Sequence, residues 1–313
     1  MKSDVVISRL NLPGFQERGV QLDLLRLDLT HPQISGNKWF KLKYNLHRAK
    51  EKGCSVLLSF GGAWSNHIHA LAFAGKEAGI TTVGVIRGEE PENYSQTLRD
   101  ARRWGMKLHF VSRQQYREKN DPVFLEQLAE IYGNYQLIPE GGSNALAVQG
   151  CREIVAQIER LGGHFDKIIC ACGTGGTLAG LIAARPEHTE IVGVPVLKGA
   201  DFLYSDIRSL LQQAGVVDPG QWRLIMDSHE GGYAKVSPQL ADCMDRFVRF
   251  AGIELEPVYT GKVMLALERM LTRGELPAGS RVLMIHSGGM QGLRGMRDLL
   301  RKQLNLHDSG YNV

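Results

Sequence analysis

The chain has 313 residues, enough for one large domain or two modest domains with a proper core. Hydrophobic residues make up 43% and charged residues 22%, as in ordinary globular proteins, and a formal net charge of +4 is too small to indicate nucleic-acid binding. The five cysteines lack paired C-x-x-C spacing, so we expect no metal site. No apolar run is long enough to span a membrane, and Met1 to Asp4 begins no signal peptide. We therefore expect a cytoplasmic protein with no membrane or nucleic-acid partner.

The first predicted strand spans residues 20–29, where apolar and polar residues alternate. A loop containing Pro32 and Gly36 follows, and a helix is expected to start near Lys38. Lys38 and Lys41 are three residues apart and therefore share one helical face. Such lysines are usually solvated surface residues, but a loop-to-helix junction rich in small polar groups modestly favours a functional lysine.

A second strand–loop–helix unit begins with a predicted strand at residues 55–60. The loop GGAWSNH, residues 61–67, leads from it into an Ala-rich helix that ends near Ala78. Ser65 could simply be the N-cap of this helix. Alternatively, Ser65, Asn66 and His67 could hold a carboxylate against the helix N-terminus.

Strands and helices continue to alternate through the middle of the chain, which predicts parallel sheets flanked by helices. Predicted strands span residues 82–86, 107–111 and 136–138, and predicted helices span residues 93–104, 122–132 and 144–161. Gly141-Gly142 is a candidate domain boundary because two adjacent glycines make a flexible joint.

The glycine-rich loop GTGGT, residues 173–177, follows an apolar strand at 167–171 and precedes a helix. This order suits a phosphate, because the first N–H groups of a helix lack internal partners and the helix dipole favours an anion there. It is not a P-loop, since no Lys-Ser/Thr pair follows, and the third glycine of a dinucleotide fingerprint is replaced by Leu178. The alternatives for this loop are a tight turn without a ligand and a loose dinucleotide loop.

The C-terminal part is predicted to hold strands at residues 190–194, 223–226 and 282–285 and helices at 201–214 and 238–251. Two further dense stretches lie here: PVYTGK at 257–262, before another helix, and HSGG at 286–289, after the last strand. Taken alone, Tyr259 would be interpreted as a packing tyrosine and Ser287 as a turn residue.

Together, these stretches resemble the fold-type-II pyridoxal-phosphate enzymes, which are similar to tryptophan synthase β. More closely, they resemble the 1-aminocyclopropane-1-carboxylate deaminase/D-cysteine desulfhydrase family. The likeness runs from Leu10 to about Gly295, and five motifs follow the family's order: SGNKWFK, GGAWSNH, GTGGT, PVYTGK and HSGG. It implies an α/β fold of two three-layer αβα domains with mostly parallel sheets, assembled as a homodimer. Residues 1–48 plus 141–313 would form a large cofactor-binding domain, and 49–140 a small domain.

The resemblance also implies roles for the cofactor site. Lys38 would carry pyridoxal 5'-phosphate as a Schiff base and later move the substrate's α-proton. Asn37 would bond the ring 3-oxygen, and Ser287 would face the pyridine nitrogen. The phosphate would be held by Lys41 and by the loop residues Gly173, Thr174, Gly175, Gly176 and Thr177.

For the substrate, the resemblance implies a small amino acid. Ser65, Asn66 and His67 would bind its carboxylate beside Trp64, with Ser65 near the reacting centre. Tyr259 and Tyr233 would face the substrate. Lys38, Ser65 and Tyr259 are therefore the predicted catalytic residues.

Two positions bear on the reaction type. The ring-opening deaminases pair the catalytic tyrosine with Glu and have Leu in the HLGG-like motif, whereas this chain has Thr260 and Ser287. A neutral hydroxyl holds a proton on the pyridine nitrogen less well than a carboxylate. This resembles the D-cysteine desulfhydrase side of the family, which eliminates sulfide and yields pyruvate and ammonia.

Departures from the family pattern keep other functions open. Trp64 replaces a usual Gln, His69 replaces a usual Arg, and Ala-Lys-Val follows Tyr233. The alternatives are 1-aminocyclopropane-1-carboxylate deaminase, a nicotinamide-dependent oxidoreductase, and a catalytically silent protein that binds pyridoxal phosphate.

Overall fold

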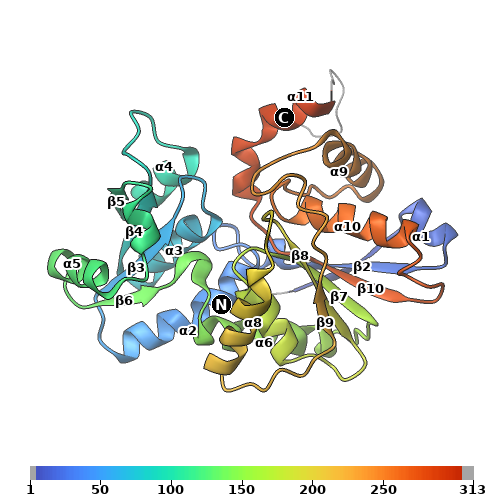
Figure 1. Ribbon diagram of the computed structural model, residues 1–313, viewed down its shortest axis with the longest axis horizontal. Helices are drawn as coiled ribbons and strands as arrows, with labels where there is room; N and C mark the ends of the chain where they lie inside the picture. Colours follow the sequence, from blue (N-terminus) through green and yellow to red (C-terminus); the bar gives the residue numbers. More distant parts are fainter. Residues whose placement is uncertain (1–4, 305–313) are drawn as a thin grey trace.

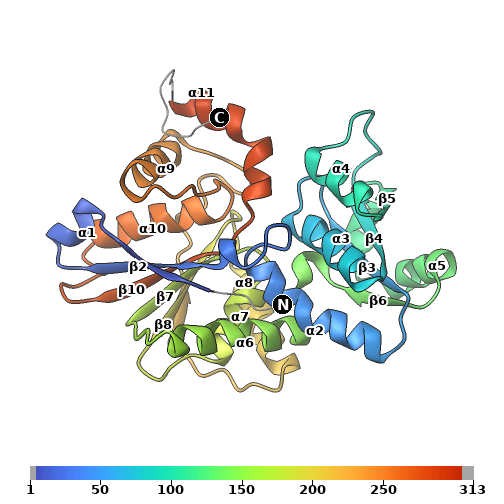
Figure 2. The same cartoon turned by 180° about the vertical axis from the view of Figure 1, so that it is seen from behind.

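The computed structural model describes residues 5–304, so the four residues considered for a signal peptide lie outside the described part. Its strands form two sheets, each with helices on both faces (Figures 1 and 2). The predicted α/β class with mostly parallel sheets is confirmed.

The larger sheet has six strands in the order β1-β2-β10-β7-β8-β9. Their bounds are Ile7–Leu10 (β1), Gln21–Arg26 (β2), Lys167–Cys172 (β7), Glu190–Pro195 (β8), Trp222–Leu224 (β9) and Arg281–His286 (β10). β1 pairs antiparallel with β2, and all the other neighbours pair in parallel. The carboxyl ends of β7 and β10 therefore point the same way.

Side chains of β7 alternate between two separate cores. Ile169 and Ala171 pack in the core that includes α1 (Pro13–Glu17), α9 (Pro238–Ala251) and α10 (Thr260–Thr272). Ile168 and Cys170 pack in the opposite core, with α6 (Ala145–Arg160), α7 (Gly176–Ala183) and α8 (Phe202–Gln213). Both faces of the sheet are covered, as Figures 1 and 2 show. A strand that is buried on both faces has a continuous run of apolar residues, which explains the sequence of β7.

The smaller sheet has four parallel strands in the order β5-β4-β3-β6. Their bounds are Val56–Gly61 (β3), Thr81–Arg87 (β4), Lys107–Val111 (β5) and Tyr135–Ile138 (β6). Leu57 packs towards α3 (Asn66–Ala78) and α4 (Gln96–Arg103), whereas Phe60 packs towards α5 (Pro122–Tyr132).

Helix α2 (Asn37–Glu51) links the two sheets, because its side chains belong to two cores. Phe40 packs in a core of the larger sheet, and Leu42 packs in a core of the smaller one. The predicted division into domains at 49–140 stays a prediction.

Most predicted elements exist, with shifted ends. The strand predicted at 20–29 ends at Arg26, because Leu27–Leu29 forms a 3-10 turn, and α7 starts inside the predicted loop at Gly176. Elements that were not predicted include β1, α1, α11 (Arg297–Leu304) and the 3-10 turns at Gln115–Glu118, Glu140–Gly142 and Met290–Gly295. Within residues 5–304, no helix is long and apolar enough to cross a membrane.

Candidate active site

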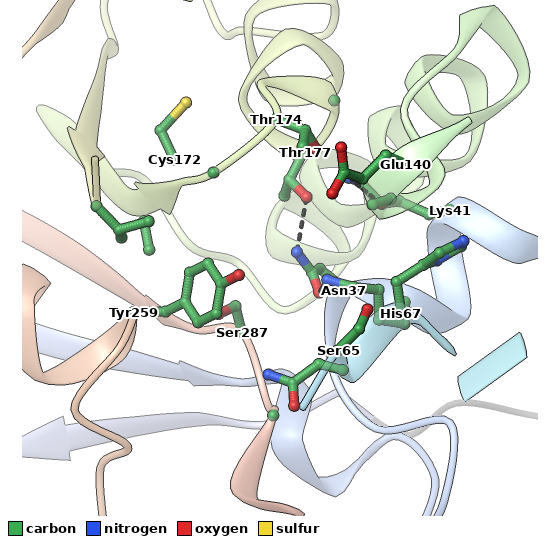
Figure 3. A pocket seen from close by; sticks show the side chains of 18 of the residues that line it. Asn37, Lys41, Ser65, His67, Glu140, Cys172, Thr174, Thr177, Tyr259 and Ser287 are labelled. Atoms are coloured by element: carbon green, nitrogen blue, oxygen red, sulfur yellow. Dashed lines mark hydrogen bonds between the residues drawn. The ribbon is translucent and has the colours of Figure 1, made fainter. Parts of the chain in front are cut away.

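A cavity of about 440 Å³ lies where β3, β4, β7 and β10 end. This is where open parallel sheets usually bind ligands. Every predicted site residue lines it: Asn37, Lys38, Lys41, Trp64, Ser65, Asn66, His67, Gly173, Thr174, Gly175, Gly176, Thr177, Tyr233, Tyr259 and Ser287. Figure 3 shows side chains from loops and helices that follow strands of both sheets around this space. The structure therefore brings together five motifs that are far apart in sequence.

The start of α2 is clamped against the end of β10. The N–H of Asn37 donates to the carbonyl of Ser287 at 3.1 Å. Gly36, just before it, has φ 75° and ψ −148°, a conformation that is essentially restricted to glycine. A Cβ at Gly36 would lie 1.8 Å from the Ser287 carbonyl oxygen. The close contact of the two backbones fixes where Lys38 begins.

Lys38 is a buried amine with an unusual protonation equilibrium. Its Nζ donates to Asn37 Oδ1 at 3.0 Å, and Asn37 Nδ2 donates to Thr177 Oγ1 at 2.8 Å. Burial, and then the charge of Lys41, lowers the pKa of Lys38 from 10.5 to about 7. A substantial fraction of this amine is therefore neutral, and hence nucleophilic, near neutral pH.

Lys41 and the glycine loop form a ready anion site. Lys41 Nζ donates to the Gly141 carbonyl at 2.8 Å and to Ser143 Oγ at 2.9 Å, and the side chain is buried. Ser143 Oγ in turn lies 2.6 Å from Thr174 Oγ1. A Cβ at Gly176 would lie 2.6 Å from Ser143 Oγ, so only glycine lets the first turn of α7 approach these groups.

The loop before α3 also ends in a helix N-terminus aimed at the cavity. Ser65 Oγ accepts the N–H of Ile68 at 3.2 Å, so Ser65 is the N-cap of α3, the ordinary alternative considered for it. Being an N-cap does not prevent the neighbouring N–H groups and side chains from binding an anion.

Two buried polar atoms in this loop have no hydrogen-bond partner within the described part of the chain: Asn66 Oδ1 and His67 Nδ1. His67 Nε2 lies 2.9 Å from Ser59 Oγ. Burial, followed by the charges of Lys38 and Lys41, lowers the pKa of His67 well below 6.5. His67 is therefore neutral, and its free nitrogen and the Asn66 oxygen remain available to a ligand.

Tyr259 enters the cavity from the loop before α10. Its ring lies 6.2 Å from the Tyr233 ring, edge to face, and a Cβ at Gly173 would lie 3.3 Å from it. Burial, and then the nearby Tyr233, raises the pKa of Tyr259 well above 10. Its hydroxyl is therefore protonated at neutral pH.

Glu256, which was not predicted from the sequence, holds the backbone of this loop. Its carboxylate accepts the N–H groups of Val258 at 2.9 Å and of Tyr259 and Thr260 at 2.7 Å each. Burial raises the pKa of Glu256 to about 7 even though these hydrogen bonds oppose the shift. An acidic residue three positions before Tyr259, at a helix start, was the available signal.

Lys262 had no predicted role beyond its place in the PVYTGK motif, but it joins the loop that carries Tyr233 to the one that carries Tyr259. It is fully buried, and its Nζ donates to the Gly232 carbonyl at 2.6 Å. The same residue therefore ties the loop of Tyr233 to the helix that follows Tyr259. Burial lowers the pKa of Lys262 to about 8.

The departures from the family pattern fall in different places. Trp64 lines the cavity and packs on Gly295, where a Cβ would lie 2.8 Å from the indole. His69 does not line the cavity; it lies 3.4 Å from Asp100, which pairs with Arg294. Thr260 also turns away, since its hydroxyl accepts the N–H of Glu256 at 2.9 Å.

Arg87 and Glu140 also line the cavity and were not predicted from the sequence. Arg87 is the last residue of β4, and Glu140 begins the turn after β6. A charged residue at the carboxyl end of a strand was the available signal. Among residues 5–304, no group of three or more His, Cys, Asp or Glu could hold a metal ion.

Comparison with known proteins agrees with this geometry. The family model "Pyridoxal-phosphate dependent enzyme" matches residues 9–288. A Thermotoga maritima protein, named provisionally as a 1-aminocyclopropane-1-carboxylate deaminase, is 32% identical over 291 residues, which cover 89% of this chain and 91% of that protein.

Two further similarities point the same way. The mitochondrial bifunctional D-cysteine desulfhydrase/1-aminocyclopropane-1-carboxylate deaminase of Arabidopsis thaliana is 29% identical over 311 residues, covering 92% of this chain and 76% of that protein. The crystal structure of an ACC deaminase homologue superposes with a TM-score of 0.86 at 30% identity, covering 96% of this chain and 94% of the other.

Proposed function

Because the chain belongs to the family of pyridoxal-phosphate dependent enzymes, we propose that it eliminates the β-substituent of a small amino acid. D-cysteine is the first substrate to test, and its products would be pyruvate, ammonia and sulfide. One observation carries the proposal: the Lys38 amine, whose pKa is about 7, shares a single cavity with two helix N-termini that can bind anions.

The residues present fit the cofactor. Lys41 and residues 173–177 would hold its phosphate, because the glycines admit an anion to the start of α7 and Lys41 adds a buried cationic donor. Asn37 would bond the ring oxygen, and Ser287 would face the ring nitrogen. When bound, the cofactor supplies an electron sink for negative charge at the substrate's Cα.

In this proposal the chain orients the substrate and moves its protons. The N-terminus of α3 and the His67 Nδ1 N–H would donate to the carboxylate of the amino acid, while Asn66 Oδ1, which only accepts, would take an N–H of the substrate; both side-chain atoms are buried without partners in the described residues. The neutral Lys38 amine would take the proton from Cα. Fixing the carboxylate and the amine together determines which bond at Cα reacts.

Tyr259 and Ser65 complete the proposed machinery. The Tyr259 hydroxyl is protonated because its pKa is raised, so it can donate a hydrogen bond to a departing group. Ser65 would lie near the reacting centre. Ser287 is a neutral hydroxyl and would not stabilise a proton on the ring nitrogen as a carboxylate would.

The family match argues against a nicotinamide-dependent oxidoreductase. Ring opening of 1-aminocyclopropane-1-carboxylate remains the second candidate, since relatives carry both names. Thr260 and Ser287 stand where the ring-opening deaminases have Glu and Leu, which favours elimination. A catalytically silent protein would have no reason to keep Lys38, Ser65 and Tyr259 in one cavity.

The test is to load the protein with cofactor, add D-cysteine and follow both the visible absorption band and pyruvate. We expect pyruvate to form, and Lys38→Ala protein to form none. If the enzyme consumed 1-aminocyclopropane-1-carboxylate faster than D-cysteine, ring opening would replace elimination as the proposed activity. No turnover with either compound or with a broad amino-acid panel would favour the silent protein.

A homodimer in the cytoplasm, without nucleic-acid partners, remains our prediction. Sedimentation of the loaded protein at several concentrations would test the dimer.

A further inference from the structure

Arg87 places a guanidinium group at the wall of the cavity. It ends β4, next to β3, whose last residue leads into the loop of Ser65. A Cβ at Gly62 would lie 3.7 Å from Arg87 Nη2, so the guanidinium lies against that loop. Arg87 is exposed to solvent on the cavity side of the sheet edge and lines the same space as Lys38.

The charge of Arg87 is not neutralised by the protein. Within residues 5–304, its side chain has no hydrogen bond and no carboxylate within 4.0 Å; its guanidinium carbon lies over the ring of Tyr116, 5.7 Å from the ring centroid. Glu140, the acid that also lines the cavity, is already engaged: Tyr116 Oη donates to it at 2.8 Å and Lys119 Nζ lies 3.5 Å away. The cavity wall therefore keeps a guanidinium that is free to bind an anion.

The other cationic and anion-binding groups of the cavity already have a proposed ligand, either the cofactor's phosphate or the substrate's carboxylate. Lys41 donates to Gly141 and Ser143 beside the phosphate loop, and the N-terminus of α3 would take the substrate's carboxylate. A small amino acid offers one further position for an anion, which is its side chain. Guanidinium matches planar and tetrahedral oxyanions in a two-pronged geometry, which suits sulfonate or phosphate better than a thiol.

We infer that Arg87 binds a negatively charged β-substituent of the substrate, so that the enzyme prefers amino acids bearing an oxyanion on Cβ. This inference rests on the proposed function and narrows its substrate class. Tyr116 is the positioning residue, because Glu140 fixes its hydroxyl while its ring supports the guanidinium.

The elimination balances without an oxidant or reductant. The Cα–H bond breaks and its proton passes to Lys38 Nζ. The bond from Cβ to sulfur or oxygen breaks, and the leaving group departs with the electron pair as sulfite or phosphate. The remaining enamine takes up water and yields pyruvate and ammonium. Because negative charge grows on the leaving group as its bond breaks, Arg87 would stabilise the transition state more than the bound substrate.

The first test compares β-substituents of different charge on the loaded enzyme. Cysteate and O-phosphoserine are the anionic substrates, β-chloroalanine is the neutral one, and both enantiomers of each are used. In Arg87→Gln protein, kcat/KM for the anionic compounds should fall by roughly 10- to 100-fold, the range for losing one charged hydrogen-bonding partner, while β-chloroalanine changes little. Arg113→Gln is the matched control, because Arg113 is an exposed arginine just past the end of the neighbouring strand β5 and does not line the cavity.

A second test measures binding without turnover. Calorimetry on the loaded enzyme should show that 3-sulfopropanoate binds more tightly than butanoate, and that Arg87→Gln removes this difference. Equal losses for anionic and neutral substrates, or equal binding of the two acids by the wild type, would overturn the Arg87 inference. If 3-sulfopropanoate shows Arg87-dependent binding but no amino acid yields pyruvate, the proposed elimination fails while the anion site stands.

Discussion

The contact between Gly36 and Ser287 can be tested by adding one methyl group. In Gly36→Ala protein, the new Cβ would meet the Ser287 carbonyl oxygen at 1.8 Å, and the carbonyl is backbone that cannot rotate away. The chain must shift, and the hydrogen bond from the N–H of Asn37 to that carbonyl would be lost or weakened. Since Lys38 is the next residue, its amine would move as well.

The expected loss of unfolding free energy in Gly36→Ala has a conformational contribution and a contact contribution. An alanine at the positive φ of Gly36 costs roughly 1–3 kcal/mol by itself. Losing the hydrogen bond adds about 1 kcal/mol, and relieving the overlap adds roughly 1–3 kcal/mol more. We expect the free energy of unfolding to fall by about 3–7 kcal/mol in total.

Gly53→Ala provides the matched control. Gly53 also has a positive φ, 61°, but a Cβ there would meet nothing within 4 Å. Its left-handed conformation should cost roughly 1–2 kcal/mol, with no effect on the cavity. Urea unfolding of the cofactor-free proteins gives both stabilities, and titration with cofactor, followed by visible absorbance, shows whether Lys38 still captures it.

We expect Gly36→Ala to be clearly less stable than Gly53→Ala and to bind cofactor poorly. Equal destabilisation of the two variants, with unchanged cofactor uptake, would refute the claim that this backbone contact positions Lys38.

Two further predictions concern protonation. Because the pKa of Lys38 is about 7, the rate of covalent cofactor capture should rise as the pH passes through that value. Lys41→Met should move the midpoint of this rise to higher pH, since the charge of Lys41 helps to lower the pKa of Lys38. Stopped-flow absorbance measures the capture rate, and a midpoint near 10.5 in the wild type would contradict the prediction. Glu256 has a pKa of about 7 in the folded chain instead of 4.5, so the folded state binds more protons between these values and the free energy of unfolding should fall as pH rises through them. The loss is on the order of 3 kcal/mol, and it should be absent from Glu256→Gln protein in urea unfolding at several pH values; the same pH slope in both proteins would exclude Glu256 as its source.

Local sequence patterns predicted the frame of the molecule well. The bounds of β5, α5 and α9 match their predictions, because each has a clear apolar period and strong end signals such as Pro122 and Pro238. β1 and α1 were missed because each is very short, and the end of β2 was misplaced because a 3-10 turn continues its apolar pattern.

The residues of the cavity were predicted by motif order, not by any one pattern. Glu256, Lys262, Arg87 and Glu140 escaped because a buried or cavity-facing charge looks like an ordinary surface charge until its surroundings are known. Thr260 and His69 show the reverse case, since both stood out in sequence and neither lines the cavity.

The sequence by itself determined the strand–loop–helix units and the groups at each loop, because backbone propensity and hydrophobic period act over a few neighbouring residues. Only the tertiary structure decided how these loops meet. Parallel pairing of β10 with β2 and β7 brings Ser287 to Gly36 and the loop at 173–177, and α2, which packs in two cores, places Lys38 in the same cavity as Ser65. Burial in that shared space then lowers the pKa of Lys38, which no local pattern encodes.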